Sequence, residues 1–121
     1  MPRILVVEDD EPLRKILVRL LSRPGCEVVE AENGHAAVQS MCRHAADLVI
    51  TDLIMPEMDG IETIRSLARD FPATKIIAIS GGGRIAGDQY LDIASKLGVQ
   101  KILAKPFSPW ELLHAVDELL A

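Results

Sequence analysis

The sequence predicts an α/β fold with a doubly wound, five-stranded parallel sheet in the order 2-1-3-4-5, flanked by five helices. Short apolar runs alternate with longer segments of helical period along all 121 residues, a rhythm typical of α/β domains. Several of these runs are almost continuous Ile, Leu and Val, as in parallel strands that helices cover on both faces. Repeated right-handed crossovers in one small domain favour an open sheet of this order.

Five segments carry the strand pattern. The strongest are residues 3–7, 47–51 and 75–79, in which apolar residues follow one another almost without interruption. Residues 26–31 and 101–104 show a weaker pattern, so we expect these two strands nearer the edges of the sheet.

Five segments carry the helical period. Apolar residues at i, i+3, i+4, i+7 and i+8 predict one helix after the first strand, and a similar stripe predicts another at the C-terminus. The first stripe comprises Leu13, Ile16, Leu17, Leu20 and Leu21, and the last comprises Leu112, Leu113, Val116, Leu119 and Leu120. Residues 34–44, 60–70 and 88–97 supply the other three predicted helices.

Composition limits the possible functions. A chain of 121 residues with 49% hydrophobic residues fits one domain, residues 1–121, with a core of its own. It carries 18 acidic against 13 basic residues and has no dense basic stretch, so we expect no direct nucleic-acid binding. No apolar run approaches the roughly 20 residues of a membrane span or resembles a signal peptide, so we expect a cytoplasmic protein without membrane insertion. Cys26 and Cys42 lack metal-ligand spacing, and we expect both to pack in apolar surroundings.

Polar side chains follow four of the five predicted strands. Glu8 and Asp9 follow the first, Asp52 the third, Ser80 the fourth and Lys105 the fifth, whereas the second contributes nothing obvious. In open α/β sheets ligands bind beyond the carboxyl ends of the strands where the winding reverses, here between the first and third strands. Each residue alone is commonplace at a strand end, but their convergence on one edge indicates a functional site.

The acidic run from Glu8 to Glu11 divides into two parts. Asp is a favoured N-cap and Pro12 suits a first helical turn, so Asp10 and Glu11 are expected to start the first helix. Glu8 and Asp9 are then left to face Asp52, and three crowded carboxylates repel one another unless a cation joins them. Oxygen ligands without a neighbouring His or Cys suit a hard ion such as Mg²⁺.

A carboxylate, a hard cation, a lysine and a hydroxyl in one shallow cleft suit phosphoryl transfer. Lys105 and the metal would neutralise phosphoryl oxygens, and the Ser80 hydroxyl would bind one of them. Asp52 is the preferred nucleophile because it stands alone in the middle of the predicted cleft. A small metal-dependent phosphohydrolase is an alternative, but it would need a general acid or base for which we find no candidate there.

These residues resemble the receiver domain of bacterial two-component response regulators, of the CheY chemotaxis type, over essentially all 121 residues. The motifs are the acidic pair after "ILVV", "DLIMPEMDG" at residues 52–60, the serine that closes "IIAIS", and "KPF" at residues 105–107. Four such motifs in order, at compatible spacing, make the resemblance specific.

The resemblance implies that Asp52 accepts a phosphoryl group from the phosphohistidine of a histidine kinase or phosphotransfer protein. It implies that Mg²⁺ binds to Glu8, Asp9, Asp52 and the backbone carbonyl of Ile54. Ser80 and Lys105 would contact the phosphoryl group, and a downstream protein target would read the phosphorylated state. Because an acyl phosphate is labile and water can reach it, we also expect slow self-dephosphorylation.

The chain departs from the family pattern at two places. Ile102 stands three positions before the lysine, where members commonly carry Tyr or Phe, and an Ile cannot swing a ring between two positions. The segment "SGGGRIAGD", residues 80–88, is long and glycine-rich, and we expect it to be the main mobile element. The first departure favours an alternative, a receiver-like scaffold that signals without phosphorylation. Ile54 and Gly82 offer no group to position water, which predicts a long-lived phosphoryl state.

Overall fold

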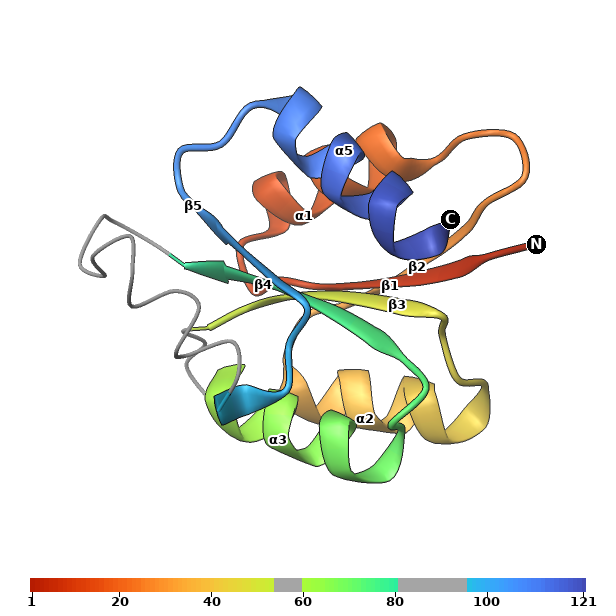
Figure 1. The fold of residues 1–121 in the computed structure, drawn as a ribbon, viewed down its shortest axis with the longest axis vertical. Coiled ribbons are helices and arrows are strands. Elements are labelled where there is room, and N and C mark those ends of the chain that lie inside the picture. The colour runs from red at the N-terminus through yellow and green to blue at the C-terminus, as the bar shows by residue number, and fades with distance from the viewer. Residues whose placement is uncertain (54–59, 81–95) are drawn as a thin grey trace.

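The computed structural model describes residues 1–53, 60–80 and 96–121, and Figure 1 draws the remaining residues as a thin grey trace. Its sheet is parallel with the strand order β2-β1-β3-β4-β5, which confirms the predicted topology. The strands are β1 (Arg3–Val7), β2 (Glu27–Ala31), β3 (Leu48–Asp52), β4 (Lys75–Ser80) and β5 (Lys101–Ala104). The described helices are α1 (Glu11–Leu21), α2 (Gly34–Arg43), α3 (Gly60–Asp70) and α5 (Pro109–Leu120). Most of the helix predicted at residues 88–97 lies outside the described residues.

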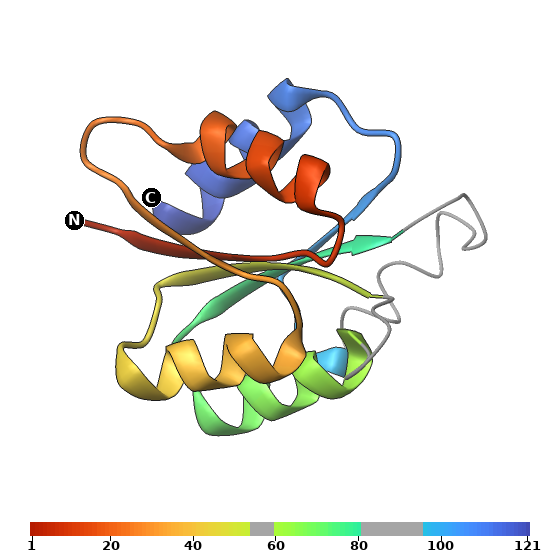
Figure 2. The ribbon, with the colours of Figure 1, turned by 180° about the vertical axis from the view of Figure 1, so that it is seen from behind.

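The sheet separates two helical layers. α1 and α5 cover one face, and α2 and α3 cover the other (Figures 1 and 2). Ile4 and Val6 of β1 pack in the core beneath α1 and α5, whereas Leu5 and Val7 pack in the core beneath α2 and α3. Successive side chains of a strand point to opposite faces, so a strand covered on both sides needs an unbroken apolar run.

Two strands end one residue later than predicted. Asp52 is the last residue of β3 and pairs with Ile79, and Ser80 is the last residue of β4 and pairs with Ala104. Their backbones still take part in the sheet, so neither residue stands on a free loop. Both functional candidates are therefore held by strand hydrogen bonding.

The start of α1 confirms the division of the acidic run. The Asp10 side chain accepts a hydrogen bond from the Leu13 N–H at 3.2 Å, and Pro12 lies in the first turn. This is the N-cap geometry that a short acidic side chain favours. Asp10 therefore serves the helix, and Glu8 and Asp9 remain for the strand edge.

The apolar stripe of α1 only partly matches the buried face. Leu17 and Leu21 are fully buried, but Ile16 is 54% exposed. Arg14, which is not in the stripe, is buried instead with an exposed fraction of 9%. A buried arginine needs polar partners, which a hydropathy pattern cannot reveal.

The expectation for the two cysteines is half right. Cys26 is half-buried against the core beneath α1 and α5, whereas Cys42 is exposed on α2. Cys42 was predicted to be buried, and this was wrong because α2 turns Ala37 and Met41 toward the core instead.

Among the described helices, none has the length and apolar character needed to cross a bilayer.

Candidate functional site

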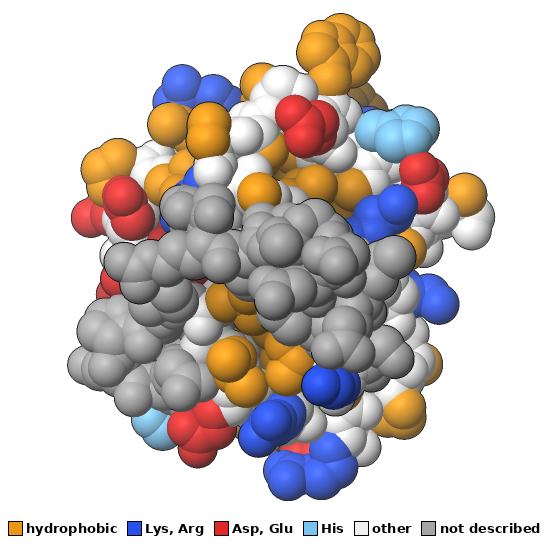
Figure 3. Space-filling view, turned by 60° about the vertical axis from the view of Figure 1, so that its left-hand side comes forward, with side chains coloured by type: hydrophobic (Ala, Val, Ile, Leu, Met, Phe, Trp, Pro, Cys, Tyr) orange, Lys and Arg blue, Asp and Glu red, His pale blue; other side chains and the backbone are white. Residues whose placement is uncertain are grey.

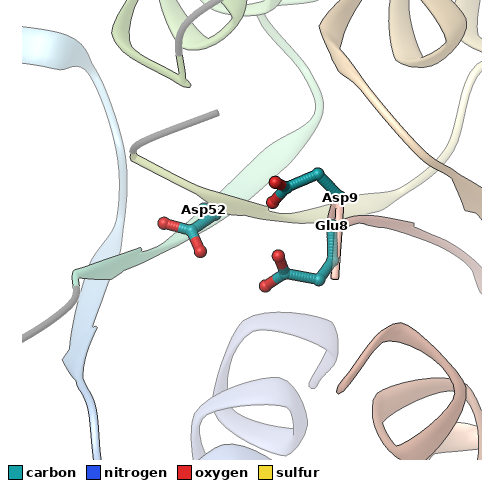
Figure 4. A group of neighbouring side chains, drawn as sticks. All are labelled: Glu8, Asp9 and Asp52. Carbon is teal, nitrogen blue, oxygen red and sulfur yellow. The ribbon is translucent and has the colours of Figure 1, made fainter. Parts of the chain in front are cut away.

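Three of the predicted site residues meet at the carboxyl edge of the sheet. Glu8 and Asp9 directly follow β1, and Asp52 ends the neighbouring strand β3. One carboxylate oxygen from each lies within 4.8 Å of the others, and the side chains of Glu8 and Asp9 extend toward Asp52 (Figure 4). Figure 3 looks onto this edge and shows acidic and basic side chains interspersed over its described surface.

The three carboxylates differ in their access to water. Glu8 is 1% exposed and Asp52 is 6% exposed, whereas Asp9 lies at the surface. Two buried carboxylates beside one another are costly unless positive charge or hydrogen-bond donors compensate them. The cluster thus needs a cation, and Asp9 marks its open side.

Lys105 supplies one positive charge. Its Nζ donates a hydrogen bond to Asp52 Oδ2 at 3.0 Å and lies 3.7 Å from Glu8 Oε1. Partial burial works against the charge, but the hydrogen bond to Asp52 and the nearby acidic charges raise the pKa of Lys105 above its ordinary value. The backbone N–H of Lys105, the residue after β5, donates a hydrogen bond to the Ser80 carbonyl at 2.8 Å. This bond holds the lysine beside the end of β4.

Glu8 is the most perturbed group of the site. Burial raises its pKa to about 7, helped by the side chain of Asp9 and the charge of Asp52, against the opposing effects of the Asp10 N–H and Lys105. Its Oε2 accepts a hydrogen bond from the Asp10 N–H at 3.2 Å. Its Oε1 is buried and accepts no hydrogen bond from any described residue. That oxygen is a ready ligand for a cation.

The donor set fits a hard divalent ion. The cluster offers carboxylate oxygens only, and Mg²⁺ prefers one or two protein carboxylates together with waters. Three negative charges face one lysine charge, so a divalent cation would leave the group neutral. Ile54, whose carbonyl was the further predicted ligand, lies outside the described residues.

Ser80 lies next to this group in the sheet. It is 4% exposed and ends β4, one residue beyond Ile79, the partner of Asp52 across the ladder. The Leu53 N–H also bonds to the Ile79 carbonyl at 2.9 Å, so β3 and β4 stay paired up to the site. The sheet therefore places Ser80 and Asp52 on adjacent strand ends.

The structure adds two residues that the sequence did not single out. Arg14 of α1 donates from Nη1 to the Glu8 carbonyl at 2.9 Å and from Nε to Glu30 Oε1 at 2.8 Å. Glu30 belongs to β2, the strand expected to contribute nothing obvious. The sequence offered one signal for this contact, namely that Arg14 stands next to the apolar stripe of its helix. That position does not predict which residues Arg14 contacts.

Comparison with known proteins identifies relatives along nearly the whole chain. Residues 4–117 match the response regulator receiver domain family. The chain is 35% identical over 120 residues to the response regulator receiver protein CpdR of Brucella abortus, covering 99% of this chain and 98% of that protein. It is 36% identical over 119 residues to the chemotaxis protein CheY of Bacillus subtilis, covering 98% and 97%. A solved response regulator receiver domain protein from Clostridium thermocellum superposes with a TM-score of 0.87 at 26% identity, covering 99% and 94%.

Proposed function

The chain belongs to the response regulator receiver domain family, and on that premise we propose that Asp52 accepts a phosphoryl group in a Mg²⁺-dependent reaction. The donor is the phosphohistidine of a histidine kinase or phosphotransfer protein. A downstream protein reads the phosphorylated state. The observation that carries the proposal is the contact of Lys105 with Asp52, beside two further carboxylates.

The division of roles follows from the contacts. Asp52 contacts the Lys105 ammonium through Oδ2 and lies beside the carboxylates of Glu8 and Asp9, so we assign the attack to an Asp52 carboxylate oxygen. An Asp52 oxygen would form a bond to phosphorus in line with the breaking bond to the histidine nitrogen, which leaves with the electron pair. The Lys105 ammonium would then pass from Asp52 to a phosphoryl oxygen, and the Ser80 hydroxyl would donate to another.

Glu8 and Asp9 are the proposed metal ligands, together with Asp52 and Ile54. The buried Glu8 Oε1, without a hydrogen-bond donor among the described residues, supports this assignment. Bound Mg²⁺ would neutralise part of the negative charge on the phosphoryl oxygens. The exposure of Asp9 leaves the cluster accessible from one side.

The product is an acyl phosphate on Asp52, and we propose that water removes it slowly. The argument for a long lifetime rests on Ile54 and Gly82, whose side chains cannot orient water, and both lie outside the described residues. The segment 80–88, proposed as the mobile element, lies outside them too except for Ser80.

A scaffold that signals without phosphorylation is the second candidate. Ile102 is half-buried and packs against the core beneath α2 and α3. A packed aliphatic side chain cannot report a change at Ser80 by rotating a ring. This observation favours a readout of the signal that does not use an aromatic side chain at position 102. The scaffold hypothesis goes further and holds that the protein signals without being phosphorylated.

Intact-mass measurement after incubation with a small acyl-phosphate donor separates the two candidates. We expect one phosphoryl adduct that requires Mg²⁺ and is absent from Asp52→Asn. Asp47→Asn, just before the opposite end of β3, is the matched control, because Asp47 is exposed and accepts a bond from the Arg3 N–H far from the site. It should retain the adduct. Wild-type protein that binds Mg²⁺ but forms no adduct would support the scaffold instead.

A further inference from the structure

We propose that Arg14 and Glu30 form a positioning pair that fixes the turn between β1 and α1 and thereby sets Glu8 and Asp9 for metal binding. This inference rests on the proposed magnesium site. It assigns a role to β2, a strand that carries none of the proposed metal ligands. Neither residue is a ligand in this account; both act through the backbone of Glu8.

The contacts form a chain across three elements. Arg14 of α1 donates from Nη1 to the Glu8 carbonyl at 2.9 Å, in a buried position, and from Nε to Glu30 of β2 at 2.8 Å. Glu30 also accepts a bond from Lys15 Nζ at 2.9 Å. The hydrogen bonds to these two cations lower the pKa of Glu30, so it stays ionised at neutral pH and keeps its hold on the guanidinium.

Glu8 is thus tied to β2 on both sides of its backbone. Its N–H bonds directly to the Ala31 carbonyl at 3.1 Å, and its carbonyl is linked to Glu30 through Arg14. The Glu8 carbonyl belongs to the planar peptide that joins Glu8 to Asp9. Fixing that carbonyl therefore fixes the plane from which both carboxylate side chains start.

The geometry of arginine suits this task. Its guanidinium is planar and offers donors in fixed directions, so one side chain can bind a carbonyl and a carboxylate together. The Arg14 side chain is only 10% exposed, and the burial limits its alternative positions. Groups that orient metal ligands in this way commonly change metal affinity 10- to 100-fold when they are removed.

A comparable ion pair lies at the other end of β1 and β2. Arg3 of β1 bonds to Glu27 of β2, and their side chains are 14% and 46% exposed, against 10% and 34% for Arg14 and Glu30. Both pairs link an arginine to the same strand with similar burial. Only the pair of Arg14 and Glu30 contacts the backbone of a proposed metal ligand, so Arg3→Met controls for the general loss of an ion pair.

The experiment measures Mg²⁺ affinity by isothermal titration calorimetry in wild type, Arg14→Met, Glu30→Met and Arg3→Met, with folding checked by thermal unfolding. We expect affinity to fall about 10-fold in Arg14→Met and in the same direction in Glu30→Met. Arg3→Met should keep wild-type affinity. The double variant of Arg14 and Glu30 should lose less than the sum of the two single losses, because the residues act as one unit.

Phosphorylation by a small acyl-phosphate donor gives a second readout. In Arg14→Met the Mg²⁺ concentration for half-maximal rate should rise about 10-fold, while the rate at saturating Mg²⁺ recovers most of its wild-type value. Arg14→Lys keeps the charge but not both contacts, and should fall between wild type and Arg14→Met.

The outcomes distinguish this inference from the proposed function. Wild-type protein that fails to bind Mg²⁺ would reject the metal site itself. Wild-type binding with unchanged affinity in Arg14→Met, or with an equal shift in Arg3→Met, would reject the positioning role alone. If Arg14→Met does not fold, Glu30→Met decides: wild-type affinity in that variant overturns the inference.

Discussion

Lys105 Nζ lies 3.0 Å from Asp52 Oδ2, a hydrogen bond between residues 53 positions apart in the chain. The contact joins the end of β3 to the residue after β5, across the intervening strand β4. In the proposed reaction the same ammonium first faces the attacking carboxylate and then the transferred group.

Replacing Lys105 by Met should separate metal binding from phosphoryl transfer. We expect phosphorylation to slow at least about 10-fold, because one charged donor to the phosphoryl oxygens is lost. Mg²⁺ affinity should not fall, because the change removes a positive charge beside the proposed ligands. Single-turnover phosphorylation and Mg²⁺ titration measure the two effects.

Lys101→Met is the control for the loss of a lysine from this region. The Lys101 side chain is 31% exposed and pairs with Glu118, and that of Lys105 is 32% exposed. Lys101→Met should phosphorylate at the wild-type rate. A normal rate in Lys105→Met would contradict the role assigned to this lysine.

Glu8 makes the stability of the metal-free protein depend on pH. Its pKa is about 7 when folded, against an ordinary value of 4.5, so the folded state holds this proton more tightly than the unfolded chain does. Its stabilising contribution is complete below pH 4.5 and is lost as pH rises through 7. Without Mg²⁺, we expect the free energy of unfolding of the protein to fall over this interval, because the buried Glu8 carboxyl loses its proton.

Urea unfolding between pH 4.5 and 8 tests this dependence. Glu8→Gln should flatten the curve over this interval, since the amide does not titrate there. Saturating Mg²⁺ should raise the stability of wild type most at the alkaline end, where the carboxylate is free to bind metal. If metal-free wild type instead became more stable relative to Glu8→Gln as pH rises, the raised pKa assigned to the buried Glu8 would be wrong.

Gly60 should be irreplaceable for a steric reason. A Cβ at this first residue of α3 would clash with the Asp52 carbonyl oxygen and would lie 2.5 Å from Leu53 Cα. Backbone atoms cannot give way as a flexible side chain can, so Gly60→Ala should lower stability by about 1 to 3 kcal/mol and displace Asp52. Mg²⁺ affinity should fall with it.

Gly25→Ala is the contrasting substitution. Gly25 has φ of +88° with open space around a Cβ, so alanine there strains the backbone by about 1 kcal/mol without a clash. It should lower the unfolding temperature and leave Mg²⁺ affinity unchanged. Equal loss of Mg²⁺ affinity in both variants would show that general destabilisation, and not the contact with Asp52, is responsible.

The sequence predicted the parts of this site that depend on local pattern. Unbroken apolar runs located the strands, and the carboxylates at their ends were expected to converge because parallel strands end at one edge. Asp10 was recognised as a cap because capping is decided within four residues.

The parts that the sequence missed depend on tertiary register. Glu30 can reach Arg14 because β2 pairs with β1 so that Glu30 stands opposite Val6, next to Ala31 and Val7. Arg14 faces inward because α1 is rotated so that Ile16 points to solvent. The register of strand pairing does not follow from hydropathy. The rotation of α1 about its axis does not either, because its stripe of five apolar residues is wider than the face that is buried.

Locating the phosphoryl group tests the central claim most directly. Wild-type protein is incubated with a small acyl-phosphate donor and Mg²⁺, reduced with borohydride, digested, and mapped by mass spectrometry. Borohydride converts an aspartyl phosphate into homoserine, so the account predicts homoserine at position 52 that is absent when Mg²⁺ is omitted. Homoserine absent from position 52, with the phosphoryl group found at a histidine or at Ser80, would contradict it.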